Sequence, residues 1–331
     1  MSTAALLMSA SDLPVVYDEN VLARLRSSLG RRLTVIAPAI HWRQHTLELA
    51  DVDVVFSGWG APRMDEAFLQ HMPALRAIFY AGGSVGYFVT DSVWQRGIRL
   101  TSAQAVNAIP VAEYATSALL LGLKRVWSHA AAVRAQRTFP RERPLPGAFR
   151  SKVGLVSFGM IARLVRDRLL ASDVDVLVYD PFLSPSEAAA ARVRLVGLDE
   201  LFATADAVSL HAPHRAETTA LIRGRHFALM KEGAFFLNTA RGEIVAESEM
   251  IAVLQRRPDL FAMLDVTAPE PPLTDALLYS LPNVVVTPHL AGSVGPECAR
   301  MGHAMVDEFE RYCAGQPLKW EIDAQRAALL A

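Results

Sequence analysis

The stretch VGLVSFGMIARLVRDRL, residues 153–169, decides the fold. A β-branched apolar run from Val153 to Phe158 enters a tight turn at Gly159, and the residues that follow place one apolar face on a helix: Ile161, Leu164, Val165 and Leu169. Strand, turn and helix in this order begin a βαβ unit, in which the helix crosses between two parallel strands.

Outward from this stretch the same pattern repeats towards the C-terminus. Short β-branched runs recur at intervals of about 20 to 30 residues, the spacing of a doubly wound parallel sheet. The runs are KVGLVSF (152–158), DVLVYD (175–180), AVSLHA (207–212), AFFLNTA (234–240), AMLDVT (262–267) and VVVTPHL (284–290). They predict one well-defined α/β domain.

The first third of the chain carries a second series of expected strands: LPVVY (13–17), RLTVIA (32–37), VDVVFSG (52–58), LRAIFYAGG (75–83) and GIRLTSA (97–103). Helical patterns are expected at 19–29, at 111–127, at 296–312 and near the C-terminus. The Arg- and Pro-rich stretch 134–150 is expected to be a loop, and the tail is expected to pack on the first domain.

Composition is that of a globular protein. Hydrophobic residues make up 52% of the 331 residues, charged residues make up 20%, and the net charge of -1 disfavours nucleic acid as a partner. Two cysteines, Cys298 and Cys313, can form neither a disulfide framework nor a zinc site, so we expect no metal and a reducing cytoplasm. The N-terminus has no signal peptide pattern, and the apolar segment 114–123 is too short to span a membrane, so we expect a buried core helix.

The turn after the first strand of the 153–169 unit predicts a dinucleotide site. The G-x-G-x-x-G pattern is degraded here, with Ser157 first, Gly159 in the middle and Ala162 last. Asp180 ends the next strand, where an acid can accept hydrogen bonds from a ribose diol and repel a 2'-phosphate, which favours NAD over NADP. The alternative is an ordinary βαβ crossover in which Asp180 only caps the turn before Pro181.

Three polar residues follow three of the expected strands, at the sheet edge where ligands bind: Arg241, Glu270 and His289. Together they suit the reduction of a 2-keto acid. The guanidinium would hold the carboxylate, the imidazole would donate a proton, and the Glu carboxylate would orient the imidazole and favour its protonated form. Singly, each has an ordinary structural alternative, as surface residue, solvated side chain or cap, and His211 shows that such strand-end histidines arise easily.

Three segments carry a resemblance to a known family: NTARGEIV (238–245), LDVTAPEPP (264–272) and TPHLAGS (287–293). In this order they resemble the Arg, Glu and His segments of the D-isomer-specific 2-hydroxyacid dehydrogenases, the family of phosphoglycerate dehydrogenases and glyoxylate/hydroxypyruvate reductases. The resemblance covers roughly residues 75–302 by motif. It implies two Rossmann-like or flavodoxin-like parallel-sheet domains, with an NAD-binding domain at 110–295 inserted into a substrate domain at 1–109 and 296–331. The active site would lie in the cleft.

The resemblance also implies further site residues. The loop AGGSVG (81–86) is similar to the family's substrate-carboxylate loop, with Gly82, Gly83, Ser84 and Val85 as ligands, and Asn107 is expected near the substrate. The residues expected to contact the cofactor are Ser157, Gly159, Met160, Ile161, Asp180, Ala212, Pro213, Thr239, Ala240 and Asp265. Ser157, Ala162 and Gly86 depart from the family pattern, and Asp265 has an alternative role as a turn residue.

The expected function is therefore NAD(H)-dependent interconversion of a small D-2-hydroxy acid and its 2-keto acid by a homodimer. The competing hypothesis is a non-catalytic NAD-sensing scaffold, similar to the corepressor members of the family, and the altered glycine turn motivates it. The side chain of the substrate stays open. Arg134, Arg137, Arg141, Arg143 and Arg150 could attract a phosphorylated substrate or could simply be solvated.

Overall fold

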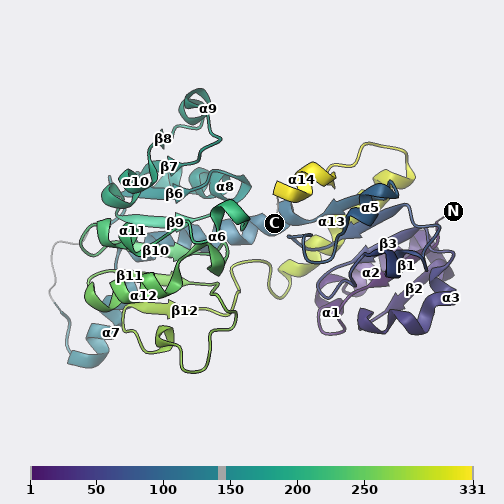
Figure 1. Ribbon diagram of the computed structural model, residues 1–331, viewed down its shortest axis with the longest axis horizontal. Coiled ribbons are helices and arrows are strands. Elements are labelled where there is room, and N and C mark those ends of the chain that lie inside the picture. The colour runs from purple at the N-terminus through teal and green to yellow at the C-terminus, as the bar shows by residue number, and fades with distance from the viewer. Residues whose placement is uncertain (1, 141–146, 330–331) are drawn as a thin grey trace. The chain divides into compact units, whose positions relative to one another are not determined.

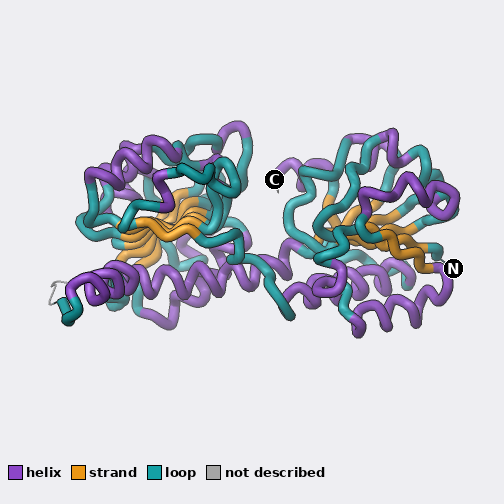
Figure 2. The backbone as a smooth tube through the Cα atoms, turned by 90° about the horizontal axis from the view of Figure 1, so that it is seen from below, coloured by secondary structure: helices purple, strands orange, loops and turns teal. Residues whose placement is uncertain are grey.

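The computed structural model describes residues 2–140 and 147–329, so Arg141 and Arg143 lie outside the described residues. The chain divides into two compact units, one of residues 1–108 with 293–331 and one of residues 109–292 (Figure 1). It crosses between the units twice, after Ala108 and after Gly292. In each unit, helices cover both faces of a central sheet (Figure 2), so the predicted α/β class is confirmed.

The first unit contains a six-stranded sheet in the order β13-β5-β4-β3-β1-β2, in which only the short edge strand β13 is antiparallel. The order of the five parallel strands, 2-1-3-4-5, is that of flavodoxin-like sheets. Their bounds are β1 (Ala4–Leu7), β2 (Leu33–Ile36), β3 (Val54–Ser57), β4 (Ala77–Tyr80) and β5 (Arg99–Ser102), with β13 at Glu321–Ile322.

Helices of the first unit are α1 (Leu13–Val16), α2 (Glu19–Leu29), α3 (Thr46–Leu49), α4 (Glu66–Leu69), α5 (Asp91–Gln95), α13 (Glu297–Cys313) and α14 (Ala324–Leu329), with 3₁₀ turns η1 (Gly30–Arg32) and η2 (Ala39–His45). The C-terminal α13 returns to this sheet, as expected. Its Phe309 ring lies 5.3 Å from the Phe56 ring centroid and 5.8 Å from the Phe79 centroid, so the tail completes the core of this unit.

One predicted strand of this unit is wrong. Residues 13–17 were expected to be extended, but Leu13–Val16 is helix α1, with a proline in its first turn, where the fixed φ of proline suits a helix. The first strand is instead Ala4–Leu7, all of whose residues are buried. Neither alanine nor leucine favours strands, so this segment carries no β-branched signal.

The second unit contains a seven-stranded parallel sheet in the order β12-β11-β10-β9-β6-β7-β8. Counted within the unit, this is the Rossmann order 3-2-1-4-5-6 with one more strand, and the strand order reverses between β6 and β9. The strands are β6 (Lys152–Val156), β7 (Asp175–Tyr179), β8 (Arg194–Leu195), β9 (Ala207–Leu210), β10 (Phe235–Asn238), β11 (Phe261–Leu264) and β12 (Val284–Val286). The sequence runs correspond to all of these except the two-residue β8.

The helices of the second unit are α7 (Val126–Gln136), α8 (Met160–Leu169), α9 (Pro185–Ala190), α10 (Leu198–Thr204), α11 (Gly224–Leu229) and α12 (Glu247–Arg256), with 3₁₀ turns η3 (Leu170–Ser172), η4 (Ala216–Thr218), η5 (Gly242–Ile244) and η6 (Leu277–Tyr279). The expected loop 134–150 is wrong at its start, because residues 134–136 end α7.

Helix α6 (Gln104–Leu123) joins the two units and differs from the expected helix 111–127. It begins seven residues earlier, includes Pro110, and ends before Arg125, whose left-handed φ of 49° separates it from α7. The helix is long and apolar enough by length and composition to cross a membrane, but 56% of its apolar window is buried. Ala115, Leu119 and Leu123 belong to the core of the second unit, which fits a core helix.

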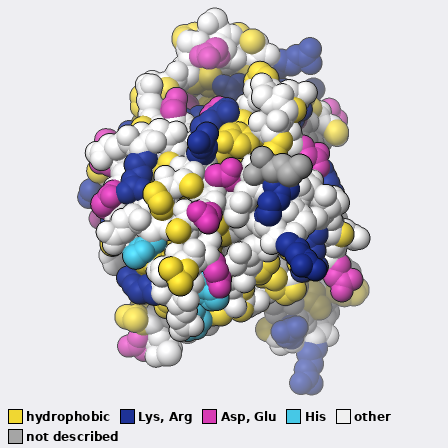
Figure 3. Space-filling model, turned by 90° about the vertical axis from the view of Figure 1, so that its right-hand side faces the viewer, with side chains coloured by type: hydrophobic (Ala, Val, Ile, Leu, Met, Phe, Trp, Pro, Cys, Tyr) yellow, Lys and Arg dark blue, Asp and Glu magenta, His cyan; other side chains and the backbone are white. Residues whose placement is uncertain are grey.

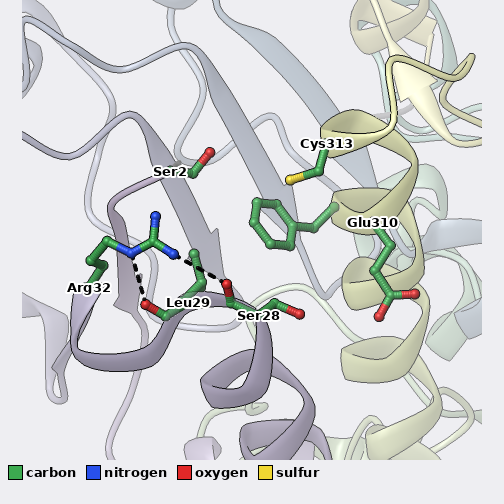
Figure 4. Close-up of a pocket in the computed structure, with 7 residues that line it drawn as sticks. Ser2, Ser28, Leu29, Arg32, Glu310 and Cys313 are labelled. Carbon is green, nitrogen blue, oxygen red and sulfur yellow. Dashed lines mark hydrogen bonds between the residues drawn. The ribbon is translucent and has the colours of Figure 1, made fainter.

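Charged side chains of both signs are interspersed on the face shown in Figure 3, in keeping with a net charge of -1. A pocket of about 300 Å³ lies in the first unit between the end of α2 with the following η1, which contribute Leu29 and Arg32, and the end of α13, which contributes Phe309, Glu310 and Cys313 (Figure 4). The Arg32 guanidinium there donates to the Leu29 and Ser28 carbonyl oxygens. The pocket contains none of the predicted site residues.

Candidate active site

The turn after β6 has the backbone of a dinucleotide-binding turn. Ser157 has a φ of 73°, the left-handed conformation that a glycine would adopt at lower cost, and its N–H donates to the Tyr179 carbonyl at 2.7 Å. The turn lies at the carboxyl end of β6, beside the point where strand order reverses. Ligands of doubly wound sheets bind at this position.

Gly159 leaves open space at the start of α8. A Cβ at Gly159 would meet nothing within 4 Å, and Met160 and Ile161 open the helix with no side-chain cap on its first amides. Ala162, at the third position of the pattern, is fully buried against the core. Free amides at a helix N-terminus attract an anionic group, so this turn fits the pyrophosphate of a dinucleotide.

The Asp180 carboxylate accepts hydrogen bonds from two different turns. Its Oδ2 accepts the Phe158 N–H at 2.7 Å and lies 3.3 Å from the Ser157 hydroxyl, while its Oδ1 accepts the Phe182 N–H at 2.8 Å. The acid therefore both caps the turn after β7 and braces the turn after β6. The sequence left ribose binding and turn capping as alternatives for Asp180, and the structure shows the capping bond together with a contact to the glycine-type turn.

The predicted cofactor residues Ala212 and Pro213 follow β9, and Thr239 and Ala240 follow β10, all at the carboxyl ends of strands on the β9 side of β6. Asn238 shapes the second of these turns. Its Oδ1 accepts the Ala240 N–H at 3.0 Å and its Nδ2 donates to the Arg241 carbonyl at 2.9 Å. Sequence reasoning missed Asn238, because a buried amide that bonds to its own turn leaves no pattern along the chain.

His211 lies directly before Ala212, at the point of strand reversal. Burial lowers its pKa to about 4, so the imidazole is neutral near pH 7. Its Nε2 atom is buried and has no hydrogen-bond partner among the described residues. This partly buried histidine therefore differs from His289, which is exposed and paired with Glu270.

Arg241 and Glu270 lie on segments whose backbones touch. A Cβ on Gly242 would stand 2.1 Å from the carbonyl carbon of Thr267, so only glycine permits this approach of the Arg241 turn to the segment that leads to Glu270. The Arg241 Nη1 donates to the Ala240 carbonyl at 2.6 Å. The half-buried guanidinium is thus fixed at the carboxyl end of β10.

Glu270 and His289 form a direct pair. The distance from Glu270 Oε1 to His289 Nδ1 is 2.6 Å, and the side chains remain 41% and 48% exposed. A carboxylate on Nδ1 leaves Nε2 as the nitrogen that can exchange a proton with another molecule. The predicted partnership is therefore present within the second unit.

The segment that carries His289 is held by Asp265, which is buried. Asp265 Oδ1 accepts the Thr287 hydroxyl at 2.6 Å and the Leu290 N–H at 2.9 Å, and its Oδ2 accepts the Ala291 N–H at 2.9 Å. His289 itself has a φ of 50°, a strained conformation for a residue with a side chain. The bonds around Asp265 sustain that conformation.

Two further residues of this network were not predicted. Tyr114 lies on α6 and its hydroxyl is 2.9 Å from the Thr287 hydroxyl, which in turn donates to Asp265. Burial raises the pKa of Tyr114. The only signal in the sequence was that Thr287 precedes His289 in the motif, which does not reveal its partners.

In the first unit, the loop after β4 presents free backbone amides. Among the described residues, none accepts a hydrogen bond from the N–H groups of residues 82–87. A run of free amides in a glycine-containing loop is a site for an anion such as a carboxylate. Gly82, Gly83, Ser84 and Val85, the predicted substrate ligands, all belong to this loop.

Asn107 lies beside the same loop. A Cβ on Gly83 would stand 3.6 Å from the Asn107 Nδ2 atom, and Asn107 Oδ1 accepts the Ser293 N–H at 2.8 Å. The amide oxygen is therefore occupied, which directs the NH₂ group as a donor towards the loop.

Within the described residues no group of three or more His, Cys, Asp or Glu side chains is arranged to hold a metal ion.

The fold and these residues define the class of protein: an α/β protein with a Rossmann-type sheet and a glycine-type turn suited to a dinucleotide. Residues 116–291 match the family model described as "D-isomer specific 2-hydroxyacid dehydrogenase, NAD binding domain". The chain belongs to the D-isomer specific 2-hydroxyacid dehydrogenase family, and NAD is its cofactor.

Among its relatives, the chain is 31% identical over 258 residues to the D-3-phosphoglycerate dehydrogenase of Archaeoglobus fulgidus. The matched region covers 78% of this chain and 49% of that protein. It is 34% identical over 251 residues to the (S)-sulfolactate dehydrogenase of Chromohalobacter salexigens, covering 75% of this chain and 81% of that protein. The chain spans about half the length of the phosphoglycerate dehydrogenases it matches.

Solved structures agree on the fold. A crystal structure of a Thermus thermophilus protein has a TM-score of 0.76 and 27% identity, covering 97% of this chain and 100% of that chain. The NAD-complexed D-isomer specific 2-hydroxyacid dehydrogenase of Lactobacillus delbrueckii ssp. bulgaricus has a TM-score of 0.78 at 20% identity, covering 97% and 99%. The predicted architecture of two Rossmann-like domains is confirmed by these neighbours.

Proposed function

We propose that this protein is an NAD(H)-dependent enzyme that interconverts a small D-2-hydroxy acid and its 2-keto acid. The observation that carries the proposal is the 2.6 Å pair of Glu270 and His289, half exposed at a sheet edge that also carries the dinucleotide turn. Residues 1–109 and 296–331 would form the substrate domain, and residues 110–295 the NAD-binding domain.

For the cofactor, the turn from Ser157 to Ile161 would take the pyrophosphate, because the amides that open α8 have no side-chain cap and Gly159 leaves space. Asp180 would accept from a ribose hydroxyl. The remaining cofactor contacts would come from Ala212, Pro213, Thr239, Ala240 and Asp265. The chemistry that NADH supplies when bound is hydride transfer to C2 of the keto acid.

For the substrate, the free amides of Gly82, Gly83, Ser84 and Val85, with the Asn107 amide and the Arg241 guanidinium, would hold the carboxylate. His289 would donate a proton from Nε2 to the C2 oxygen while Glu270 keeps the ring oriented through Nδ1. In the oxidative direction the same nitrogen would accept the hydroxyl proton. Arg241, Glu270 and His289 are the proposed catalytic residues.

A panel of keto acids tests the activity. Glyoxylate, hydroxypyruvate, pyruvate and bulkier keto acids are offered with NADH, and NADH oxidation is followed by absorbance. Phosphohydroxypyruvate and sulfopyruvate belong in the panel, because relatives are named for phosphoglycerate and sulfolactate. Turnover of at least one keto acid is expected, and no turnover of any would end the enzymatic proposal.

A non-catalytic NAD-sensing scaffold is the competing function, motivated by Ser157 in place of glycine. Ser157 nevertheless adopts the glycine-like conformation, so this departure does not remove the turn. NADH-dependent stabilisation of a dimer without turnover would favour the scaffold.

We also propose that the protein is a cytoplasmic homodimer. Analytical sedimentation can test the oligomeric state.

A further inference from the structure

One buried hydroxyl holds the backbone of the substrate loop. Ser102, at the end of β5, is fully buried, and its Oγ lies 2.8 Å from the Gly82 carbonyl oxygen and 2.8 Å from the Gly83 carbonyl oxygen. The same oxygen accepts the Gln104 N–H at 3.2 Å. The single hydroxyl proton is therefore shared between two consecutive carbonyl groups of the loop.

This contact fixes the direction of two amides. In a trans peptide the C=O of one residue and the N–H of the next point in opposite directions, and the peptides of this loop are not among the cis bonds of the chain. Carbonyls of Gly82 and Gly83 that point at Ser102 make the N–H groups of Gly83 and Ser84 point away from it. These two amides are among the free donors of the loop.

Two tyrosine side chains also restrict the position of the substrate loop. A Cβ on Gly82 would stand 2.5 Å from the Tyr80 ring, so the loop lies directly on that ring. The Tyr80 hydroxyl is 3.1 Å from the Tyr87 hydroxyl, which donates to the Gly58 carbonyl at 3.4 Å. These contacts restrict where the loop lies, whereas Ser102 bonds to the carbonyls that set the direction of the amides.

We propose that Ser102 is a positioning residue for substrate binding: it turns the Gly83 and Ser84 amides outward as a preformed site for the carboxylate of the keto acid. The inference rests on the proposed function. Without the hydroxyl, the buried Gly82 carbonyl and the partly buried Gly83 carbonyl lose this donor, and the peptides can rotate towards other partners. The amides would then no longer be aligned before the substrate arrives, which raises the cost of binding.

The test is Ser102→Ala in the full-length protein, with Ser57→Ala as matched control. Ser57 is also a fully buried serine at the end of a strand in the same sheet, but its hydroxyl donates to the Leu7 carbonyl at 2.5 Å and makes no hydrogen bond to the loop. The measurements are kcat and KM for the best keto acid, the Kd of NADH, and the Kd of oxamate in the NADH complex by calorimetry.

We expect Ser102→Ala to raise KM and the oxamate Kd by about tenfold, the effect of losing a hydrogen bond that aligns a charged ligand. The fall in kcat should stay below about threefold and the NADH Kd should not change, because the hydride and proton donors are untouched. Ser57→Ala should leave KM and the oxamate Kd within about twofold of the unmodified protein, since its hydroxyl bonds elsewhere.

Equal KM and oxamate Kd in Ser102→Ala and Ser57→Ala would overturn the inference, as would a loss confined to kcat. If Ser102→Ala does not fold, Ser102→Cys, with a similar shape and a weaker donor, must show an intermediate rise in the oxamate Kd. The binding experiment separates the two proposals: lack of turnover with every keto acid counts against the function, whereas oxamate binding that ignores Ser102 counts against the inference.

Discussion

The Nδ1 atom of His289 lies 2.6 Å from Oε1 of Glu270, across 19 residues of sequence that include the whole of β12. Each residue follows a different parallel strand, β11 for Glu270 and β12 for His289, and these strands pair directly. Strand pairing therefore brings the two side chains to one edge. The free Nε2 of a carboxylate-bonded imidazole is the arrangement that a proton donor requires.

A double-mutant cycle tests this pair. His289→Ala should lower kcat with the best keto acid by about 100-fold or more, the usual contribution of a placed general acid. Glu270→Gln should lower it by about 10-fold or more, and the double variant should be little worse than His289→Ala, because Glu270 acts through the histidine.

The matched control for this cycle is His45→Ala. His45 and Glu48 form another exposed pair, with His45 Nδ1 2.7 Å from Glu48 Oε2, in the first unit. Its loss should leave kcat unchanged. Fully additive effects of the Glu270 and His289 changes would contradict the proposed partnership.

The open space at Gly159 predicts a cofactor effect without a folding effect. Gly159→Ala should leave thermal stability nearly unchanged, because the φ of Gly159 is -73° and a Cβ there meets no atom within 4 Å. The same change should weaken NADH binding by about tenfold or more, because the added methyl occupies space that the pyrophosphate needs. Gly197→Ala is the control, because Gly197 caps α10 in a similar extended conformation with equal space. Calorimetric NADH titrations that give the same Kd for both variants would contradict this assignment.

The left-handed backbone of Ser157 predicts a stabilising substitution. Ser157→Gly should raise the free energy of unfolding by about 0.5–1 kcal/mol, because glycine adopts a φ of 73° without the steric cost that a Cβ brings. The loss of the 3.3 Å contact to Asp180 offsets only part of this gain. Urea unfolding of the apo protein measures the change, and a lower midpoint for the variant would count against strain at this turn.

The lowered pKa of His211 predicts a window of pH-dependent stability. Its pKa is about 4 in the folded protein against an ordinary value near 6.5, so between these pH values the unfolded chain binds a proton that the native state does not. The contribution of His211 to the free energy of unfolding is fully present above about pH 6.5 and is lost as the pH decreases towards 4. The loss from this group is about 3 kcal/mol at most.

His211→Gln should reduce that loss. The comparison is the free energy of unfolding at pH 7.5 and pH 5, with His45→Gln, at a partly exposed histidine of the first unit, as control. An unchanged pH dependence in His211→Gln would show that the imidazole is not held neutral by the fold.

The contact of Gly242 with Thr267 predicts a severe local effect. Gly242→Ala would place a methyl 2.1 Å from a backbone carbonyl carbon, which must move, so we expect a loss of about 3 kcal/mol in stability. Because the displaced segment leads to Glu270, kcat should fall as well. Thermal unfolding and steady-state kinetics, with Gly197→Ala again as control, check both effects, and a variant as stable as the control would disprove the close approach.

Much of the fold could be predicted from the sequence. The strands after Val153 are apolar runs of mainly valine, leucine and phenylalanine that are largely buried, so their composition marks them clearly. The signal failed at Ala4–Leu7, whose residues favour no strand, and at Leu13–Val16, where a proline begins a helix in a run that looks extended. It also failed at Arg125, whose left-handed φ divides one expected helix into two.

The candidate site was predictable only in part. Arg241, Glu270 and His289 stand at strand ends, a position that the alternation of strands and helices reveals. Asn238, Thr287, Tyr114 and Ser102 hold these segments or the substrate loop through side-chain bonds, and their partners lie far along the chain or in the backbone. No spacing rule encodes such bonds.

By itself the sequence determined the α/β class, the dinucleotide turn and the three strand-end residues, because hydrophobic period and turn chemistry are local properties that every short segment carries. Only the tertiary structure decided that Glu270 meets His289, that Asp265 braces the histidine segment, and that Ser102 turns two loop amides outward. These relationships depend on strand pairing and on the direction of individual bonds, which are fixed when distant segments pack together.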